Sequence, residues 1–330
     1  MKIMSVTIKD IARVAGVSYS TVSKALNNSS LVKDTTKQRI IAIANKMHYE
    51  PNYAAQKLVS KQTKIIGLIW PTIDRVVLSS LVTQINKKIN QTPYSMILSV
   101  DSVQASLDRF KRFQVDGIIL FEESTDTTIK HDTIPLISYG VSRDNQMNYP
   151  IIDPNHEKAM YEAVKYLIEL GHHSIAYIGD FSASDPLQVT KYHGYKKAMQ
   201  HFGLPLDKNH QIDTKGLDWY NGYSAGNKLL KNTNLPTAII GGSYDISAGV
   251  IRCIKEEKLN IPQDLSIISC DNVPEMEKLE VPLTCIGVPI DHLANEIVKS
   301  MIMYIENKEL EPCVKKMTPV LSERNSCAKK

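Results

Sequence analysis

The sequence lacks the short motifs on which most catalytic and metal sites depend. It contains no G-x-G-x-x-G, no P-loop, no G-x-S-x-G and no H-E-x-x-H, so no phosphate-binding loop, nucleophile elbow or zinc pair is indicated. His172 and His173 are adjacent, which on a helix end or in a loop points their rings apart. We therefore expect no enzymatic activity, no metal and no cofactor.

Cysteine and long apolar runs are also scarce. The 5 cysteines are odd in number and lack C-x-x-C spacing. This usage is typical of cysteines that serve as small core residues or as free thiols in a reducing compartment. No stretch of 18 apolar residues occurs, and MKIMSVTIKD offers one lysine and a short apolar run before charge resumes, too little for a signal peptide. We expect a cytoplasmic protein with no membrane partner.

Acidic residues are few near the start of the chain. Residues 1–64 hold 11 Lys or Arg but only 3 Asp or Glu, a net charge of +8, whereas the other 266 residues hold 28 and 32, a net charge of −4. A basic block on a slightly acidic body is typical of a protein that neutralises phosphates, with an incidental basic terminus as the alternative.

Two short apolar-periodic runs flank a glycine within this basic block, in TIKDIARVAGVSYSTVSKALNN, residues 7–28. The first run places four apolar residues on one helical face: Ile8, Ile11, Ala12 and Ala15. Gly16 can adopt the left-handed conformation that ends a helix sharply, and Ser18 can cap a second helix.

The second run separates apolar from polar side chains around a helix. At about 100° per residue, one side carries Val22, Ala25 and Leu26. The other side carries polar side chains: Tyr19, Ser20, Ser23, Lys24 and Asn27. This pattern predicts a helix-turn-helix whose second helix enters the major groove of DNA, with a surface helical hairpin that binds nothing as the alternative.

A third helix is predicted over 35–49, with Asp34 as its N-cap. Its apolar stripe is formed by four residues: Ile40, Ile43, Ala44 and Met47. Pro51 stops this helix. The following segment NYAAQKLVS, residues 52–60, is too short a helix to be stable alone in water, so we expect coil there until something packs on it.

The segments VTIKDIARVAGVSYSTVSKALNN and YEPNYAAQKLVSKQTKIIGLI, residues 6–28 and 49–69, resemble the head of the lactose-repressor/galactose-repressor (LacI/GalR) family of bacterial transcription regulators. The resemblance implies a DNA-binding headpiece, a hinge helix with its linker, and an effector-binding and dimerisation core: 1–50, 51–62 and 63–330. It also implies that the hinge helix folds on operator DNA when two subunits pair. Ala55 and Leu58 then face the minor groove and Leu58 wedges between base pairs, with packing of Leu58 on the protein's own body as the alternative.

The same resemblance assigns base reading to three residues: Tyr19, Ser20 and Lys24. Lys24 stands where many members carry Arg, so a forked contact to guanine becomes a single-point contact. Seven further residues match positions that mostly bind phosphates or support the headpiece: Thr7, Ser18, Thr21, Ser23, Asn27, Tyr49 and Asn52. Hydroxyl and amide groups suit that task, because phosphate contacts position a protein without reading the base sequence.

Beyond Lys64 apolar runs of four to seven residues alternate with helical stretches, and the pattern restarts after Asp153. Such alternation predicts βαβ units and parallel sheets, hence an α/β core of two lobes behind a small all-α headpiece. The resemblance covers essentially the whole chain and implies a periplasmic-binding-protein-like core with three crossovers. It divides the core into an N-lobe and a C-lobe: 63–153 with 287–317, and 154–286 with 318–330.

A ligand is expected in the cleft at the carboxyl ends of the strands. Asp271 stands at the family's ligand-acceptor position, where a carboxylate can accept two sugar hydroxyls or cap the next turn. Lys191 and Tyr244 stand where most members carry Arg and Asn, which disfavours the common neutral-sugar pose; a cation is compatible with an acidic or phosphorylated ligand. Trp70 and Trp219 could stack on a sugar ring, with core packing as the alternative for each.

The sequence therefore predicts a ligand-controlled repressor that binds near-palindromic double-stranded operator DNA as a homodimer. Its expected effector is a sugar or sugar derivative, and a protein corepressor is a further partner that some family members use. One alternative is a small-molecule receptor with no DNA role, which would have no reason for +8 in residues 1–64. Another is an enzyme on the same core, for which a catalytic constellation is lacking.

Overall fold

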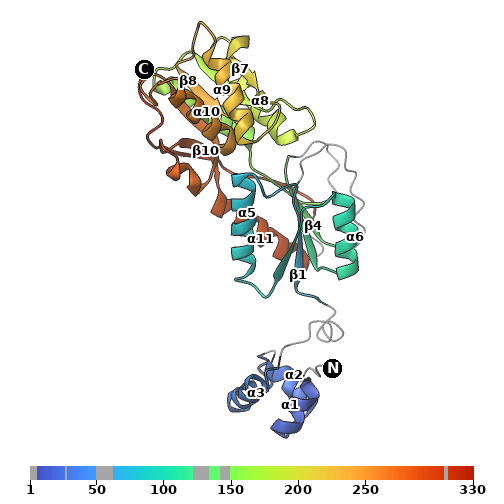
Figure 1. The fold of residues 1–330 in the computed structure, drawn as a ribbon. Coiled ribbons are helices and arrows are strands. Elements are labelled where there is room, and N and C mark those ends of the chain that lie inside the picture. The colour runs from blue at the N-terminus through green and yellow to red at the C-terminus, as the bar shows by residue number, and fades with distance from the viewer. Residues whose placement is uncertain (1–5, 27, 50–61, 122–133, 142–148, 308–310) are drawn as a thin grey trace. The chain divides into compact units, whose positions relative to one another are not determined.

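The computed structural model describes residues 6–26, 28–49, 62–121, 134–141, 149–307 and 311–330. The chain divides into two compact units, Met1–Thr63 and Lys64–Lys330, both drawn in Figure 1. None of the helices in the described ranges has the length and apolar character needed to span a membrane.

The described part of the smaller unit contains three helices: α1 (Ile8–Ala15), α2 (Tyr19–Leu26) and α3 (Asp34–Lys46). Each helix contributes a fully buried residue to one small core, and these are Ile11, Val22 and Ile40. Because three short amphipathic helices bury their apolar faces against one another, each is stabilised by the other two rather than by its own propensity.

The prediction for the third helix is wrong at both ends. Lys33 is the N-cap, without a side-chain cap, and Asp34 is the first helical residue, with Oδ1 3.2 Å from Lys37 Nζ. At the other end the helix stops at Lys46, and His48 takes a φ of 50°, a left-handed conformation that no helix can continue through. Tyr49 therefore follows the helix instead of ending it.

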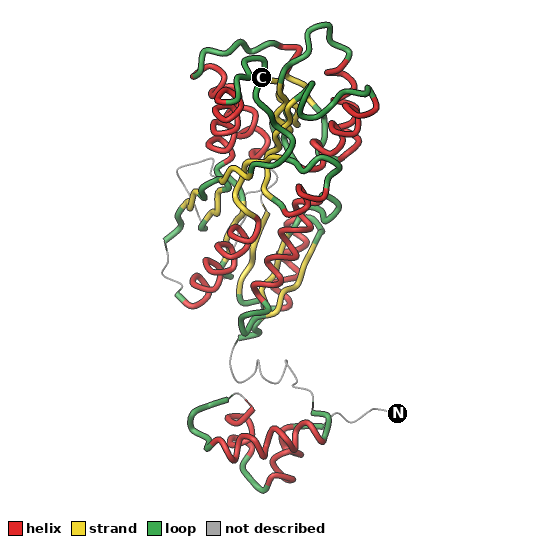
Figure 2. The backbone as a smooth tube through the Cα atoms, turned by 90° about the vertical axis from the view of Figure 1, so that its left-hand side faces the viewer, coloured by secondary structure: helices red, strands yellow, loops and turns green. Residues whose placement is uncertain are grey.

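The described residues of the larger unit form two sheets, which run through the middle of this unit with helices on either side (Figure 2). The first has the order β11-β5-β4-β3-β1-β2 and is parallel throughout. Its strands are β1 (Ile65–Ile69), β2 (Ser95–Ser99), β3 (Gly117–Phe121), β4 (Leu136–Tyr139), β5 (Ile151–Asp153) and β11 (Val314–Lys316). The second has the order β12-β10-β9-β8-β6-β7, in which β12 is antiparallel to β10. Its strands are β6 (Ile175–Gly179), β7 (Gln211–Asp213), β8 (Ala238–Gly241), β9 (Ser266–Asn272), β10 (Thr284–Pro289) and β12 (Val320–Ser322).

Helices cover both faces of both sheets. On the first sheet, α5 and α11 pack on one face and α6 on the other; on the second, α9 and α10 pack on one face and α7 and α8 on the other (Figure 1). Their bounds are α5 (Val76–Ile89), α6 (Val103–Phe113), α7 (His156–Glu169), α8 (Pro186–His201), α9 (Trp219–Leu230), α10 (Tyr244–Glu256) and α11 (Ile290–Glu306). Two short 3₁₀ turns lie at Lys208–His210 and Pro274–Lys278. The sheets are buried on both faces, which explains their unbroken apolar strands.

The chain passes from one sheet to the other at 153–156, at 289–290 and at 316–320. The predicted α/β architecture of two parallel-sheet lobes is confirmed. Four strands of three residues each escaped prediction: β5, β7, β11 and β12. Helix α8 begins at Pro186, because Asp185 caps it and Pro186 occupies its first turn.

Candidate functional site

A sharp turn joins the first two helices of the smaller unit. Gly16 has a φ of 62° and ends α1, as predicted. The Thr7 side chain forms a capping box with Asp10 at the start of α1, which orients this helix. Ser18 caps α2, because its Oγ accepts a hydrogen bond from the Thr21 amide at 3.1 Å. Local sequence thus fixes the angle at which α2 leaves the turn.

Helix α2 presents one buried and one exposed face. Val22 and Ala25 are 0% and 1% exposed, whereas Tyr19 is 47% exposed. Ser20 and Lys24 are also exposed, and Lys24 forms no ion pair within the described part of the chain. An unpaired cation, a phenol and a hydroxyl on one face of a short helix are suited to reading the base edges of a major groove.

The predicted phosphate-binding or supporting residues fall into two groups. Ser18 and Thr21 lie at the start of α2 with their hydroxyl oxygens 2.8 Å apart, and Ser23 is half-buried. Tyr49 is half-buried, and burial, with the neighbouring Tyr19 second, raises the pKa of its phenol. The remaining calls lie outside the described residues: Asn27, Asn52, Ala55, Leu58 and the hinge helix.

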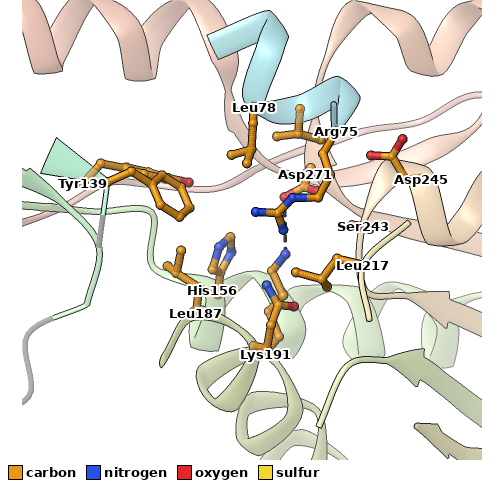
Figure 3. A pocket seen from close by; sticks show the side chains of 13 residues that line it. Arg75, Leu78, Tyr139, His156, Leu187, Lys191, Leu217, Ser243, Asp245 and Asp271 are labelled. Carbon is orange, nitrogen blue, oxygen red and sulfur yellow. Dashed lines mark hydrogen bonds and ion pairs between the residues drawn. The ribbon is translucent and has the colours of Figure 1, made fainter. Parts of the chain in front are cut away.

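A second candidate site lies between the two lobes of the larger unit. The space measures about 420 Å³, including the part that is open to solvent. Phe121 and Tyr139 are the last residues of β3 and β4, and Ser243 and Asp271 lie at the carboxyl ends of β8 and β9. The other lining residues are Arg75, Val77, Leu78, His156, Leu187, Gln188, Lys191, Leu217 and Asp245 (Figure 3). The cavity is thus in the place where open α/β sheets bind ligands.

Lys191 and Asp271 form a buried ion pair in this cavity. The Lys191 ammonium is 3.4 Å from Asp271 Oδ1 and donates a hydrogen bond to the Gly242 carbonyl at 2.8 Å. Burial alone would lower the pKa of Lys191, but Asp271, Cys270 and Asp185 together raise it above its ordinary value. Lys191 therefore remains charged. Asp271 has a φ of 78°, a strained conformation of the kind that gathers at ligand sites.

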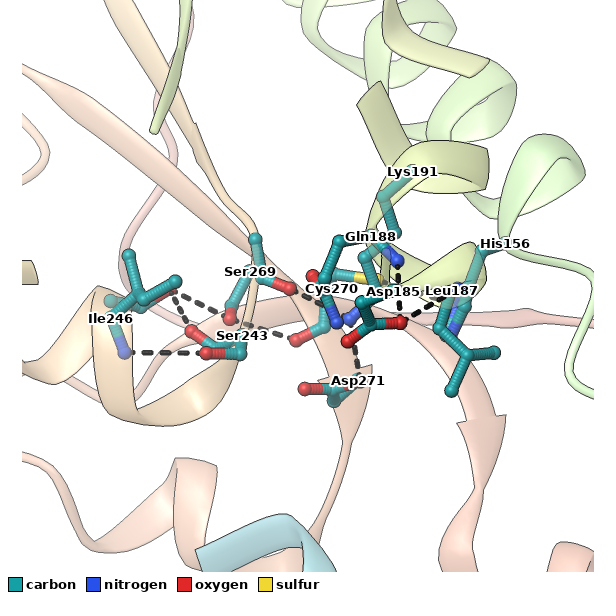
Figure 4. Close-up of polar contacts among 12 residues, drawn as sticks. His156, Asp185, Leu187, Gln188, Lys191, Ser243, Ile246, Ser269, Cys270 and Asp271 are labelled. Carbon is teal, nitrogen blue, oxygen red and sulfur yellow. Dashed lines mark hydrogen bonds and ion pairs between the residues drawn. The ribbon is translucent and has the colours of Figure 1, made fainter. Parts of the chain in front are cut away.

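His156 and Cys270 lie beside this pair (Figure 4), with Cys270 Sγ 3.7 Å from His156 Nδ1. Burial, and then Lys191, lower the pKa of His156 well below its usual value, and burial raises the pKa of Cys270 to about 12. Imidazole and thiol are thus both neutral, which is the opposite of a reactive thiolate–imidazolium pair. No group of three potential metal-ligating side chains occurs among the described residues.

Of the predicted effector residues, the structure brings Lys191 and Asp271 together in the cavity. Tyr244 is half-buried against the core of the larger unit and does not line the cavity. Trp70 is 1% exposed and packs behind the cavity wall, with its ring 5.0 Å from Phe121. Trp219 is 43% exposed and stacks on Tyr223 on α9. For both tryptophans the contacts are those of packing within the protein.

The polar residues of the cavity that sequence reasoning missed include Arg75, His156, Gln188, Ser243 and Asp245. Arg75 and Asp245 each follow the carboxyl end of a strand, β1 and β8, at the start of the next helix. A search of every strand-to-helix loop for charged residues could have found those two. Gln188 lies in the first turn of α8.

Comparison with known proteins gives concordant matches. Residues 7–52 match the model of bacterial regulatory proteins of the lacI family, and residues 164–327 match the periplasmic binding protein-like domain. Catabolite control protein A of Priestia megaterium is 28% identical over 333 residues, which cover 98% of this chain and 99% of that protein. The HTH-type transcriptional regulator DegA of Bacillus subtilis (strain 168) is 32% identical over 309 residues, 89% of either chain. A structure of the lac repressor dimer bound to operator and the anti-inducer ONPF has a TM-score of 0.81 at 23% identity, covering 98% of this chain and 99% of that one.

Proposed function

We propose, on the premise that this chain belongs to the LacI family of bacterial regulatory proteins, that it represses transcription from a near-palindromic operator under the control of a small-molecule effector. The protein is a DNA-binding transcriptional regulator. The observation that carries the finer proposal is the exposed polar face of α2, opposite a buried face, within a headpiece of high positive charge.

Base reading is assigned to the exposed face of α2. Tyr19, Ser20 and Lys24 reach base edges in the major groove, and Lys24 makes a single-point contact because an ammonium cannot fork. The hydroxyls of Thr7 before α1, of Ser18 before α2, and of Thr21 and Ser23 within α2 bind phosphates or orient the helix. The same role for Asn27, Tyr49 and Asn52, and the minor-groove role of Ala55 and Leu58, remain predictions from the sequence.

The protein acts as a homodimer on DNA, as the lac repressor does in the structure that it resembles. Two-fold symmetry places two recognition helices in successive major grooves, so half-sites should be separated by about one helical turn. A regulator that binds chromosomal DNA works in the cytoplasm.

The interlobe cavity is the effector site, and a sugar or sugar derivative is its ligand. A small molecule bound between two lobes changes the relative stability of their open and closed arrangements. A shift between these arrangements can alter the spacing of the two headpieces in a dimer. Coupling must be reciprocal: a ligand that weakens operator binding is itself bound more weakly by the operator complex.

Selection of randomised duplexes on the purified full-length protein tests the proposal. We expect enrichment of a two-fold-symmetric sequence, and Lys24→Ala should relax it at particular base pairs. A Lys197→Ala variant, which alters an exposed cation of the larger unit, should select the same sequence and serves as the control. A pool that stays random at moderate salt with the unmodified protein, alone and with mixtures of sugars and sugar derivatives, would refute sequence-specific regulation.

A further inference from the structure

The N-terminus of α5 lies in the cavity and is capped from the opposite lobe. Its N-cap residue, Arg75, provides no side-chain cap. The Asp245 carboxylate, at the start of α10, instead accepts a hydrogen bond from the Val76 amide, with 3.2 Å between N and Oδ2. Because a helix begins with unpaired amides and partial positive charge, this end of α5 is a place for an anion.

The surroundings of Asp245 disfavour the charged form of its carboxyl group. Burial raises the pKa of its carboxyl to about 6, and the neighbouring Asp271 adds to this rise. The Val76 amide and Arg75 oppose the rise. The negative charge of Asp245 is thus poorly solvated in its present position. An anionic group brought by a ligand would meet the same amide and the same guanidinium.

Other polar groups converge on the same cavity. Figure 3 shows the Arg75 side chain reaching from the start of α5 toward Lys191 and Asp271. Gln188 is 5% exposed and lines the cavity as well, yet its Oε1 has no hydrogen-bond partner among the described residues. A buried acceptor without a donor is costly, so Gln188 points to a ligand that brings a hydroxyl group.

We propose that the effector is a hydroxylated anion, a sugar acid or a sugar phosphate, whose anionic group displaces the Asp245 carboxylate from the N-terminus of α5 and binds there beside Arg75. The hydroxyls of the same molecule meet Gln188 Oε1 and the free edge of Asp271, and Phe121 with Tyr139 forms the apolar wall. This inference rests on the proposed function, because it takes the cavity as the effector site.

Displacement of Asp245 also gives the ligand a way to act on the lobes. The bond from Val76 to Asp245 joins α5 of one sheet to α10 of the other. An anion that takes the amide from Asp245 removes this tie and replaces it by contacts of its own. A neutral sugar can satisfy Gln188 and Asp271 through its hydroxyls, but it has no charge with which to compete for the α5 terminus.

Thermal melting and titration calorimetry of the full-length protein test the ligand class. The panel consists of hexonates, hexuronates and hexose phosphates, each beside its neutral parent hexose, with the carboxylates and the phosphates as separate arms. We expect at least one anion to raise the melting temperature and to bind at least about tenfold more tightly than its neutral parent, the factor that one charge-assisted hydrogen bond supplies.

Three variants locate the anionic group. Arg75→Gln should weaken binding of that anion about tenfold or more, whereas Asp245→Asn, which removes the competing charge and keeps an acceptor for Val76, should strengthen it about threefold or more. Arg252→Gln is the matched control, because Arg252 is an exposed arginine on α10 that pairs with Glu256 and does not line the cavity. It should leave the affinity unchanged.

Three results would overturn the inference. They are a neutral hexose that binds as tightly as its anion, an Asp245→Asn variant that binds the anion more weakly, and a panel in which no anion binds at millimolar concentration. Operator selection without ligand separates these failures from failure of the proposed function: a protein that selects a symmetric operator but prefers neutral sugars is still the proposed regulator.

Discussion

Replacement of Asp245 by Asn should stabilise the larger unit at neutral pH. In the native protein the pKa of this carboxyl is raised from 3.8 to about 6. Between these two pH values the native state therefore keeps a proton that the unfolded chain has already released. Stability therefore falls as pH rises from about 4 to about 6, and the full penalty of charging Asp245 is present above pH 6. At 1.36 kcal/mol per pH unit its upper limit is about 3 kcal/mol. We expect a gain of about 1–2 kcal/mol for Asp245→Asn at pH 7.5, because partial solvation reduces the limit.

Urea unfolding followed by tryptophan fluorescence measures this gain, since both tryptophans, Trp70 and Trp219, lie in the larger unit. The difference between variant and parent should disappear near pH 4, where Asp245 is protonated. Asp264→Asn is a control of opposite sign, because hydrogen bonds from Asn260 lower the pKa of Asp264 and its carboxylate should be stabilising at pH 7.5. A variant at Asp245 that loses stability at pH 7.5, or gains equally at pH 4, would refute the argument.

Three further predictions concern the headpiece and the cavity. Lys24→Ala should flatten the preference among operator variants in a competition assay. A uniform loss of affinity for all DNA, with the salt dependence of binding reduced by about one phosphate contact, would make Lys24 a phosphate ligand instead. Gly16→Ala should destabilise the headpiece by about 1 kcal/mol in thermal melts of the isolated unit, because φ is 62° at this residue. Gly16→Asn should destabilise it less. Equal stabilities of the two variants and the parent would contradict the left-handed turn. Lys191→Met should lower the free energy of unfolding by about 3 kcal/mol in urea, because it leaves Asp271 buried and unpaired. Adding Asp271→Asn should restore most of the lost stability. If the double variant is no more stable than Lys191→Met, the broken ion pair is not the cause of the loss.

Local signals explain how much of the fold could be predicted. The first two headpiece helices, α1 and α2, follow from a glycine, two caps and apolar periodicity between Thr7 and Leu26. Most strands of the larger unit are continuous apolar runs because their sheets are covered on both faces. The four short strands have no such signal. Val314–Lys316 is a strand only because it pairs with β5, and Val320–Ser322 only because it pairs with β10, far away in the sequence.

The cavity was predictable only in part, for a related reason. Lys191 and Asp271 were selected through the family resemblance, and their ion pair joins residues 80 positions apart. Arg75 and Asp245 could not be connected from the sequence, since the bond from Val76 to Asp245 spans 169 positions and exists only when the lobes face each other. Nor does any local pattern reveal that Gln188 Oε1 is buried without a partner among the residues that the structure describes.

Thermodynamic linkage shows whether a ligand in the cavity controls DNA binding by the headpiece. The affinity of the sugar-derived ligand should be measured twice by calorimetry, on the free protein and on the saturated operator complex. We expect the two affinities to differ by about fivefold or more, which should equal the factor by which that ligand changes operator affinity in a separate titration. Identical ligand affinities for the free and the operator-bound protein would contradict this control of DNA binding by the ligand.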